Sequence, residues 1–309
     1  MIERTPEQLT DNPPCPVCGV QNLRRLFADA ELPLHICNCG LVSLHPQPTE
    51  AELKELYGAG YYASWGIDGE EPASTRLMKR ATFASRLAAL PSGKKPGKVL
   101  DVGCATGAFL EVACEAGWDV YGVELSEFSC KIARRTFGDR VFCGMLHQAA
   151  YADNSFDLIT LSDLLEHVSD PDEFLVEAHR LLENDGSLLI VTPNVVGATS
   201  KLMRSRWSHY KREHLWYFSP ETIGRLLRQY GFEVDDIRPA PKYLNLAYII
   251  NQFRIYRHPL LTPLSRLLDI IVPGFLKRRN FPVLCGEMLV LASRRGEKTS
   301  RRDLEGSTR

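Results

Sequence analysis

The stretch that decides the fold is Lys98-Val-Leu-Asp101-Val-Gly103-Cys-Ala-Thr-Gly107-Ala-Phe-Leu110. A short apolar run ends in Asp101, a loop with two glycines follows, and the next residues show the apolar spacing of a helix. In an open α/β sheet, such a strand–loop–helix turn is where a cofactor binds. Gly103 lets the backbone turn tightly, and Gly107 opens the helix without a side chain. The stretch has neither the G-x-G-x-x-G of dinucleotide sites nor the Lys-Ser/Thr of phosphate loops. The pattern Asp-x-Gly-x-x-x-Gly therefore favours a cofactor without a pyrophosphate. The carboxylate of Asp101 could pair with an ammonium group of such a cofactor.

Strand and helix patterns alternate after this turn. Strands are predicted near 98–102, 119–123, 140–143, 156–161 and 187–192, and helices near 107–116, 126–137, 171–182 and 219–230. Two further strand patterns cover 231–237 and 285–292. The alternation predicts an α/β fold with parallel strands and right-handed crossovers.

Glu124 ends the second predicted strand, where a carboxylate can accept hydrogen bonds from both hydroxyls of a ribose. With this residue in place the chain resembles the class I S-adenosylmethionine (SAM)-dependent methyltransferases. The resemblance is carried by Asp101, Gly103, Gly107 and Glu124, followed by residues 156–167 and 186–193. It implies a Rossmann-like, seven-stranded, mostly parallel sheet whose last strand is antiparallel. It also implies methyl transfer from SAM to a small-molecule acceptor such as a sugar, a glycan precursor, a lipid-linked molecule or a secondary metabolite.

The resemblance implies four further cofactor contacts, at Cys104, Leu125, Met145 and Ser162. In this family an acidic residue often meets the adenine after the third strand. This chain has Gly144-Met-Leu-His147 there, so backbone groups are the alternative for that contact.

His167 is the first candidate for a general base. The strand that ends at Ser162 delivers Asp163, Glu166 and His167 to the carboxyl edge of the sheet. A histidine near its ordinary pKa is the commonest base for removing a proton from an acceptor. The alternative is a structural turn, since Leu-Glu-His also occurs in similar methyltransferases with varied acceptors.

His214 and Tyr217 are the second pair of candidates, as base or orienting residue. They lie in a stretch rich in histidine and aromatic residues, 207–218, directly before a predicted helix. In similar families such a segment borders the acceptor pocket, and packing is the alternative role. Residues 162–165 read Ser-Asp-Leu-Leu. Methyltransferases that modify nucleobase or amide nitrogen typically carry Asn/Asp-Pro-Pro-Tyr/Phe there, so this sequence argues against such acceptors.

Four cysteines near the start form a Cys-x-x-Cys and a Cys-x-Cys pair, each followed by glycine: Cys15, Cys18, Cys37 and Cys39. Two such turns can place four thiolates tetrahedrally around a structural zinc ion, which would supply much of the folding energy of so small a unit. Free thiols are the alternative. Four cysteine ligands would leave no open position for catalysis.

The chain is expected to divide into a zinc-ribbon-like unit (1–45), a helical linker or N-terminal cap (46–97), the methyltransferase domain (98–293) and a disordered tail (294–309). A helix is predicted from Thr75 to Leu90, and the tyrosines of 57–62 pack between units or line the mouth of the site. An insertion at 239–284 mixes aliphatic and basic residues. It is either a helical cap over the site or, through 244–279, a membrane-surface element.

The composition of the chain limits its possible partners and its cellular compartment. The chain has 309 residues and a net charge of −1, which gives no reason to expect a nucleic acid partner. It shows neither a signal peptide nor a membrane-spanning run, and its nine cysteines then point to a reducing, cytoplasmic compartment where thiols outnumber disulfides. Two alternatives to a small-molecule enzyme stay open. One is an RNA-binding methyltransferase that grips RNA through the zinc unit, and the other is a SAM-binding scaffold without catalysis.

Overall fold

The structure, a computed structural model, describes residues 14–20, 22–49, 52, 72–255 and 261–295. Its main sheet has the strand order β10-β11-β8-β7-β4-β5-β6. The strands are β4 (Lys98–Val102), β5 (Asp119–Glu124), β6 (Val141–Cys143), β7 (Phe156–Ser162), β8 (Leu182–Pro193), β10 (Phe232–Asn245) and β11 (Asn280–Arg294). β11 runs antiparallel to both of its neighbours, β10 and β8, and the other pairs are parallel, which confirms the predicted seven-stranded, mostly parallel fold.

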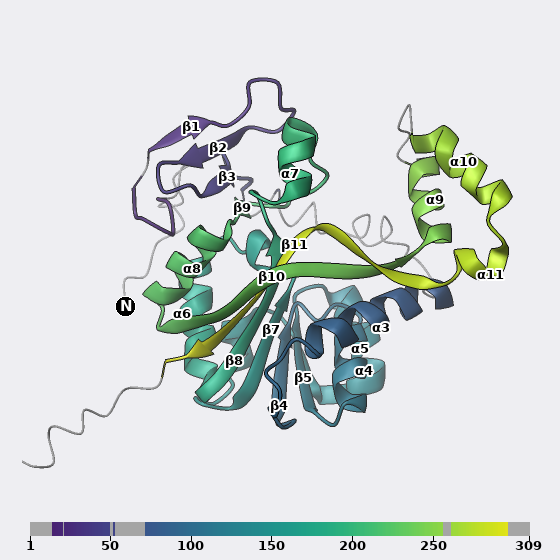
Figure 1. The fold of residues 1–309 in the computed structure, drawn as a ribbon. Coiled ribbons are helices and arrows are strands. Elements are labelled where there is room, and N and C mark those ends of the chain that lie inside the picture. Colours follow the sequence, from purple (N-terminus) through teal and green to yellow (C-terminus); the bar gives the residue numbers. More distant parts are fainter. Residues whose placement is uncertain (1–13, 21, 50–51, 53–71, 256–260, 296–309) are drawn as a thin grey trace, which may run out of the picture.

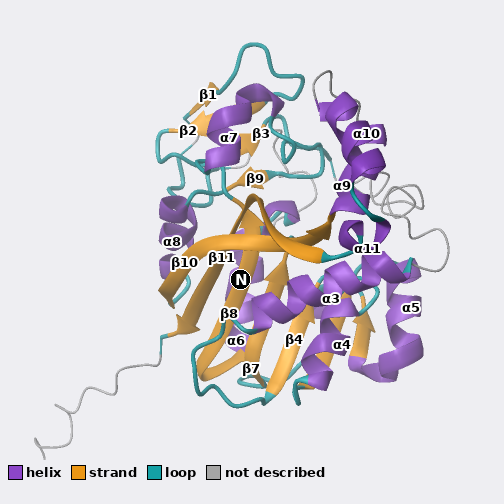
Figure 2. Cartoon of the chain, turned by 45° about the vertical axis from the view of Figure 1, so that its right-hand side comes forward, coloured by secondary structure: helices purple, strands orange, loops and turns teal. Residues whose placement is uncertain are grey.

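Helices cover both faces of the main sheet (Figures 1 and 2). The helices are α3 (Ala73–Leu87), α4 (Ala108–Glu115) and α5 (Glu127–Phe137) on one face, and α6 (Pro171–Leu181) and α8 (Pro220–Gln229) on the other. Side chains alternate between the two faces along each strand. Val99 and Leu158 therefore pack under α3, α4 and α5, while Leu100 and Ile159 pack under α6 and α8. This near-continuous burial explains why the strands read as apolar runs.

The starts of α6 and α8 follow from their capping residues. Asp170 Oδ1 accepts the N–H groups of Asp172 and Glu173, and Ser219 Oγ accepts the N–H of Thr222. Each cap precedes a proline in the first helical turn, where its missing N–H costs nothing. Both helices therefore begin where the sequence predicts.

The N-terminal residues form a second, four-stranded sheet above the main one (Figure 1). It comprises β1 (Leu23–Arg25), β2 (Leu34–Cys37), β3 (Val42–Leu44) and β9 (Trp216–Tyr217). Its last strand, β9, comes from far along the chain, so this sheet extends beyond the unit predicted at 1–45. Leu34, Val42 and Leu44 pack on Trp207 and Tyr217, which gives this sheet a core of its own.

The predicted insertion is shorter than 239–284. Residues 239–245 and 280–284 belong to β10 and β11, which pair as a long ribbon interrupted by bulges. The ribbon ends in α9 (Leu246–Ile255), α10 (Leu261–Ile271) and α11 (Gly274–Lys277), which stand away from the main sheet (Figure 1). The tyrosine segment 57–62 and most of the predicted tail lie outside the described residues.

Seven of the nine cysteines are free thiols, as expected, and one pair is a disulfide that the sequence did not predict. Cys130 in α5 and Cys143 at the end of β6 form a disulfide, with Cα atoms 5.7 Å apart. Their separation of 13 residues in sequence carries no signal of this contact, which arises because α5 packs back along β6.

Four charged side chains from four elements meet near the carboxyl edge of the sheet. Arg86 of α3 lies 3.2 Å from Asp163, which follows β7, and 3.5 Å from Glu287 of β11. Lys242 of β10 pairs with Glu287 and lies 3.7 Å from Asp163. Two cations and two anions thus balance, and their pairing joins α3 and the β10–β11 ribbon to the loop after β7.

Glu287→Gln tests this network. We expect it to lower the free energy of unfolding by about 3–5 kcal/mol, because it leaves the buried Arg86 and the half-buried Lys242 facing one carboxylate. Chemical denaturation measures the change. The control is Asp236→Asn, which breaks a half-exposed ion pair with Arg238 and should cost less than about 1 kcal/mol. Equal losses in the two variants would show that the buried network contributes no special stability.

Candidate active site

The glycine loop between β4 and α4 is fixed by its backbone. Gly103 and Gly107 have φ angles of +74° and +89°, a region that favours glycine. The N–H groups of Gly103 and Cys104 both donate to the carbonyl of Val123, at 2.8 and 3.1 Å. The loop is therefore tied to the carboxyl end of β5.

Glu124 lies directly after that point and is buried. Its Oε2 accepts the N–H of Ala105 at 2.8 Å, and its Oε1 accepts the N–H of Ser126 at 2.8 Å. These two bonds orient the carboxylate along the glycine loop, where the sequence predicts a ribose. A carboxylate has about four acceptor positions, which suits recognition of a pair of hydroxyls.

Asp101 lies beneath the same loop. Its Oδ1 accepts the hydroxyl of Thr160 at 2.6 Å, and only 3% of its surface is exposed. Burial raises the pKa of this carboxyl to about 7, against the opposing effects of Thr160 and Arg86. Near neutral pH, Asp101 can therefore change charge in response to a cationic ligand.

The four other predicted cofactor residues surround this loop at the carboxyl edge. Cys104 is buried, whereas Leu125 and Met145 are exposed apolar side chains after β5 and β6. The hydroxyl of Ser162, at the end of β7, is buried without a hydrogen-bond partner among the described residues. Exposed apolar side chains beside an oriented carboxylate fit a nucleoside, whose base is apolar on its faces and whose ribose is polar.

Two of the predicted catalytic residues meet at the carboxyl end of β7. The rings of His167 and His214 lie edge to face with centroids 4.6 Å apart. Glu166 lies beside them and accepts the hydroxyl of Thr192 at 2.9 Å. Its other oxygen and Nδ1 of His214 are buried, with no hydrogen-bond partner in the described part of the chain.

Burial pushes these three groups toward their neutral forms. It lowers the pKa of His167 to about 4 and that of His214 well below its usual value. Burial, assisted by the charge of Asp163, raises the pKa of Glu166 to about 8. One ligand atom from each of Glu166, His167 and His214 lies within 4.8 Å of the others, so the three side chains could also hold a metal ion.

The predicted role of Tyr217 as base or orienting residue stays a prediction. Its hydroxyl donates to the carbonyl of Lys211 and accepts the N–H of the same residue, both at 3.1 Å. Burial raises the pKa of the Tyr217 hydroxyl above its usual value. These contacts favour a structural contribution, in which Tyr217 closes the loop that presents His214.

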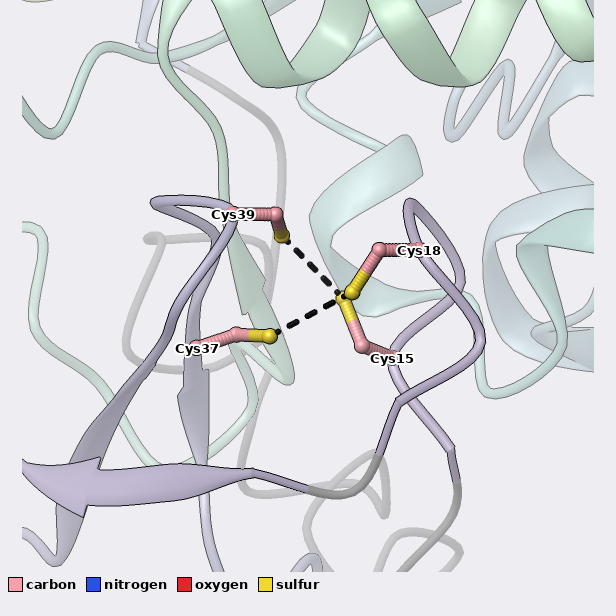
Figure 3. Close-up of side chains that lie close together, drawn as sticks. All are labelled: Cys15, Cys18, Cys37 and Cys39. Atoms are coloured by element: carbon pink, nitrogen blue, oxygen red, sulfur yellow. Dashed lines mark hydrogen bonds between the residues drawn. The ribbon is translucent and has the colours of Figure 1, made fainter.

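The four N-terminal cysteines come together as the sequence predicts (Figure 3). Their sulfur atoms all lie within 4.8 Å of one another, and the Cys15–Cys39 and Cys18–Cys37 sulfur pairs are 3.5 Å apart. Two turns from separate parts of the unit direct the thiols to one point, so this cluster could hold a metal ion.

The chain matches a known protein family. The profile of a methyltransferase domain family matches residues 75–237, just over half of the chain. The chain is a class I SAM-dependent methyltransferase. The match covers the glycine loop, Glu124 and both histidines, while the cysteine unit and most of the ribbon lie outside it.

Curated relatives of this methyltransferase include two named ubiquinone biosynthesis O-methyltransferase. The protein of Pseudomonas aeruginosa (strain UCBPP-PA14) is 30% identical over 171 residues, which cover 48% of this chain and 72% of the relative. That of Thiobacillus denitrificans is 31% identical over 156 residues, covering 45% and 66% respectively.

Solved structures share the fold of this methyltransferase at lower identity. The [4+2]-cyclase SpnF aligns with a TM-score of 0.52 and 19% identity, covering 81% of this chain and 98% of its own. A methyltransferase of Haloferax volcanii, solved with the activator Trm112, also gives 0.52 at 16% identity, covering 79% and 98%. One of these two is named for a cyclisation, so the fold does not by itself fix the reaction.

Two threonines that were not predicted as site residues hold the carboxylates of the site. Thr160 bonds Asp101 and Thr192 bonds Glu166, and both threonines are fully buried. A signal was present, since each is a single polar residue inside an otherwise apolar strand segment of the methyltransferase. In a buried strand such a residue needs a hydrogen-bond partner, which points to a nearby polar site.

The pKa of Asp101 predicts that SAM binding depends on pH. Below about pH 7 the carboxyl is protonated and loses its attraction for the ammonium group, so SAM affinity should fall roughly tenfold between about pH 8 and about pH 6. Calorimetric titration measures this. Asp101→Asn should bind SAM weakly and without that dependence. Asp119→Asn, at the opposite end of β5, should behave as the wild type does, and an unchanged profile in Asp101→Asn would exclude Asp101 as the titrating group.

Proposed function

We propose that this methyltransferase transfers the methyl group of SAM to a hydroxyl of a small-molecule acceptor. Candidate acceptors are a sugar, a glycan precursor, a lipid-linked molecule or a secondary metabolite. The observation that carries the proposal is the pair of packed, neutral imidazoles, His167 and His214, at the strand edge next to the glycine loop. The names of the curated relatives, which are O-methyltransferases, support oxygen as the acceptor atom.

The residues around the glycine loop fit SAM. Glu124 would bind the ribose hydroxyls, Asp101 the ammonium group, and Leu125 and Met145 the faces of the adenine. When bound, SAM supplies an electrophilic methyl group on a sulfonium. The chain's own contribution is to hold donor and acceptor aligned, an effect worth roughly 7–11 kcal/mol in well-oriented reactions.

His167 is the better placed of the two histidines to take a proton. Its Nδ1 lies 2.9 Å from the carbonyl of Glu213, and because a carbonyl only accepts, Nδ1 carries the hydrogen. This tautomer makes Nε2 the basic nitrogen. We infer that Nε2 accepts the acceptor's hydroxyl proton as the oxygen–methyl bond forms, with His214 holding the ring of His167 in place.

We also infer that the cysteine cluster binds a structural zinc ion. Four thiols that converge from two turns match the tetrahedral sulfur set that zinc prefers. The cysteine unit is small, and small units of this kind draw much of their folding free energy from the bound metal. With four cysteine ligands the ion would keep no site for substrate.

The test uses SAM labelled in its methyl group and a panel of phenols, sugars and polyprenylated phenols. We expect transfer to a hydroxyl compound, and a loss of about 100-fold or more in His167→Ala with unchanged affinity for S-adenosylhomocysteine. Glu124→Ala should lose that affinity. The control is His147→Ala, an exposed histidine at the same sheet edge, which should retain activity.

Three outcomes would contradict the proposal. A folded wild type that binds neither SAM nor S-adenosylhomocysteine would exclude the cofactor site. Binding without transfer to any member of the panel would favour a scaffold. Salt-dependent binding of RNA, with methylation of that RNA, would favour the nucleic-acid alternative.

The zinc proposal predicts about one zinc ion per purified chain. Cys18→Ser should lose the metal and lower the melting temperature, because the sheet that contains β9 loses its anchor. Cys114→Ser changes an exposed cysteine on α4 and should retain zinc. Elemental analysis of the three proteins decides the matter, and equal zinc contents in all of them would contradict the proposed ligand set.

A further inference from the structure

The helices at the tip of the β10–β11 ribbon expose apolar side chains that the proposed reaction does not use. On α10 these are Leu264, Leu267, Ile270 and Ile271, and on α11 Phe275. Ile270 is 83% exposed and Phe275 is 76% exposed. Isolated apolar side chains on a surface need no explanation, but a group on consecutive elements indicates a binding surface.

The orientation of α10 is the reverse of that expected for a helix on a soluble domain. Leu264, Leu267 and Ile271 are spaced three and four residues apart, which places them on one side of the helix. Ser265 is buried on another side, where its hydroxyl donates to the carbonyl of Thr262. The helix thus buries a serine and half-buries Leu268, while it turns four other aliphatic side chains outward, where a partner can cover them.

The same segment is strongly basic. Residues 261–284 contain four basic residues and one acidic residue, although the whole chain has a net charge of −1. The acid, Asp269, is paired with Arg254 and Lys277. Arg266 on α10 and Arg278 and Arg279 after α11 are exposed, so positive charge lies beside the apolar side chains.

We propose that α10 and α11 bind the surface of an anionic lipid bilayer, with the apolar side chains in the interface and the arginines on the headgroups. Charge complementarity favours this occupant over a second copy of the chain, because a symmetric contact would bring two basic surfaces together. Among the described residues no helix has the length and apolarity to cross a bilayer. The contact is therefore with the surface of the membrane.

The β10–β11 ribbon connects the proposed lipid-binding helices to the ionic network near the site. β10 and β11 carry Lys242 and Glu287 of the buried ionic network, and the same strands lead directly into α9 and out of α11. Lipid binding itself does not depend on the proposed methyl transfer. It can be measured with vesicles that contain no acceptor.

The experiment is flotation of the full-length protein with phosphatidylcholine vesicles, with and without phosphatidylglycerol. We expect binding to the anionic vesicles and much weaker binding to the neutral ones. Ile270→Asp with Phe275→Asp should reduce the partition coefficient by about tenfold or more, because both side chains leave the interface. Arg278→Gln with Arg279→Gln should reduce it by about fivefold for each charge removed.

The matched control is Leu202→Asp, since Leu202 is an equally exposed leucine (84%) on α7 (Ala198–Met203), beside the N-terminal sheet. It should bind vesicles like the wild type. Retained S-adenosylhomocysteine binding reports that each variant is folded. The proposal is overturned if the wild type does not bind anionic vesicles or if Leu202→Asp loses binding equally. A wild-type dimer that Ile270→Asp with Phe275→Asp dissociates would also overturn it, since a second copy would then cover this surface.

Discussion

The position of the loop that carries His214 depends on a two-residue strand pairing. Val42 opposes Tyr217 and Ser43 opposes Trp216, and the N–H of Leu44 extends the contact to the carbonyl of Leu215. The N–H of Leu215 in turn donates to the carbonyl of Glu166 at 2.8 Å. Backbone hydrogen bonds thus run without a break from the cysteine unit to the loop after β7. The cysteine unit is in this way attached directly to the loop that carries Glu166.

Burial sets the charge of the site. It raises the pKa values of Asp101 and Glu166 and lowers that of His167, so each group is shifted toward its neutral form. Ion pairs lie nearby, where Arg86 and Lys242 meet Glu287 and Asp163. Neutral imidazoles at this edge suit a reaction between a cationic donor and an uncharged hydroxyl, because they do not repel the donor.

Local sequence signals predict the parts of this structure that depend on neighbouring residues. The strand at 98–102, the helix starts at Pro171 and Pro220, and the meeting of four cysteines all follow from patterns within a few residues. The predictions were incomplete or wrong where distant segments pair. The extension of β10 and β11 into the predicted insertion, the fourth strand of the N-terminal sheet, and the Cys130–Cys143 disulfide are of this kind. Each is fixed by tertiary packing, for which one sequence carries no periodic signal.

The late position of β9 in the chain has a consequence for biosynthesis. Roughly 170 residues separate Leu44 from Trp216, so the first three strands of the small sheet leave the ribosome long before the fourth. At about 5–20 residues per second, the delay is on the order of 10–35 s. During that interval the apolar side of β2 and β3 has no Trp207 or Tyr217 to cover it. The nascent cysteine unit must therefore stay soluble, with this apolar side uncovered, until Trp207 and Tyr217 have been made.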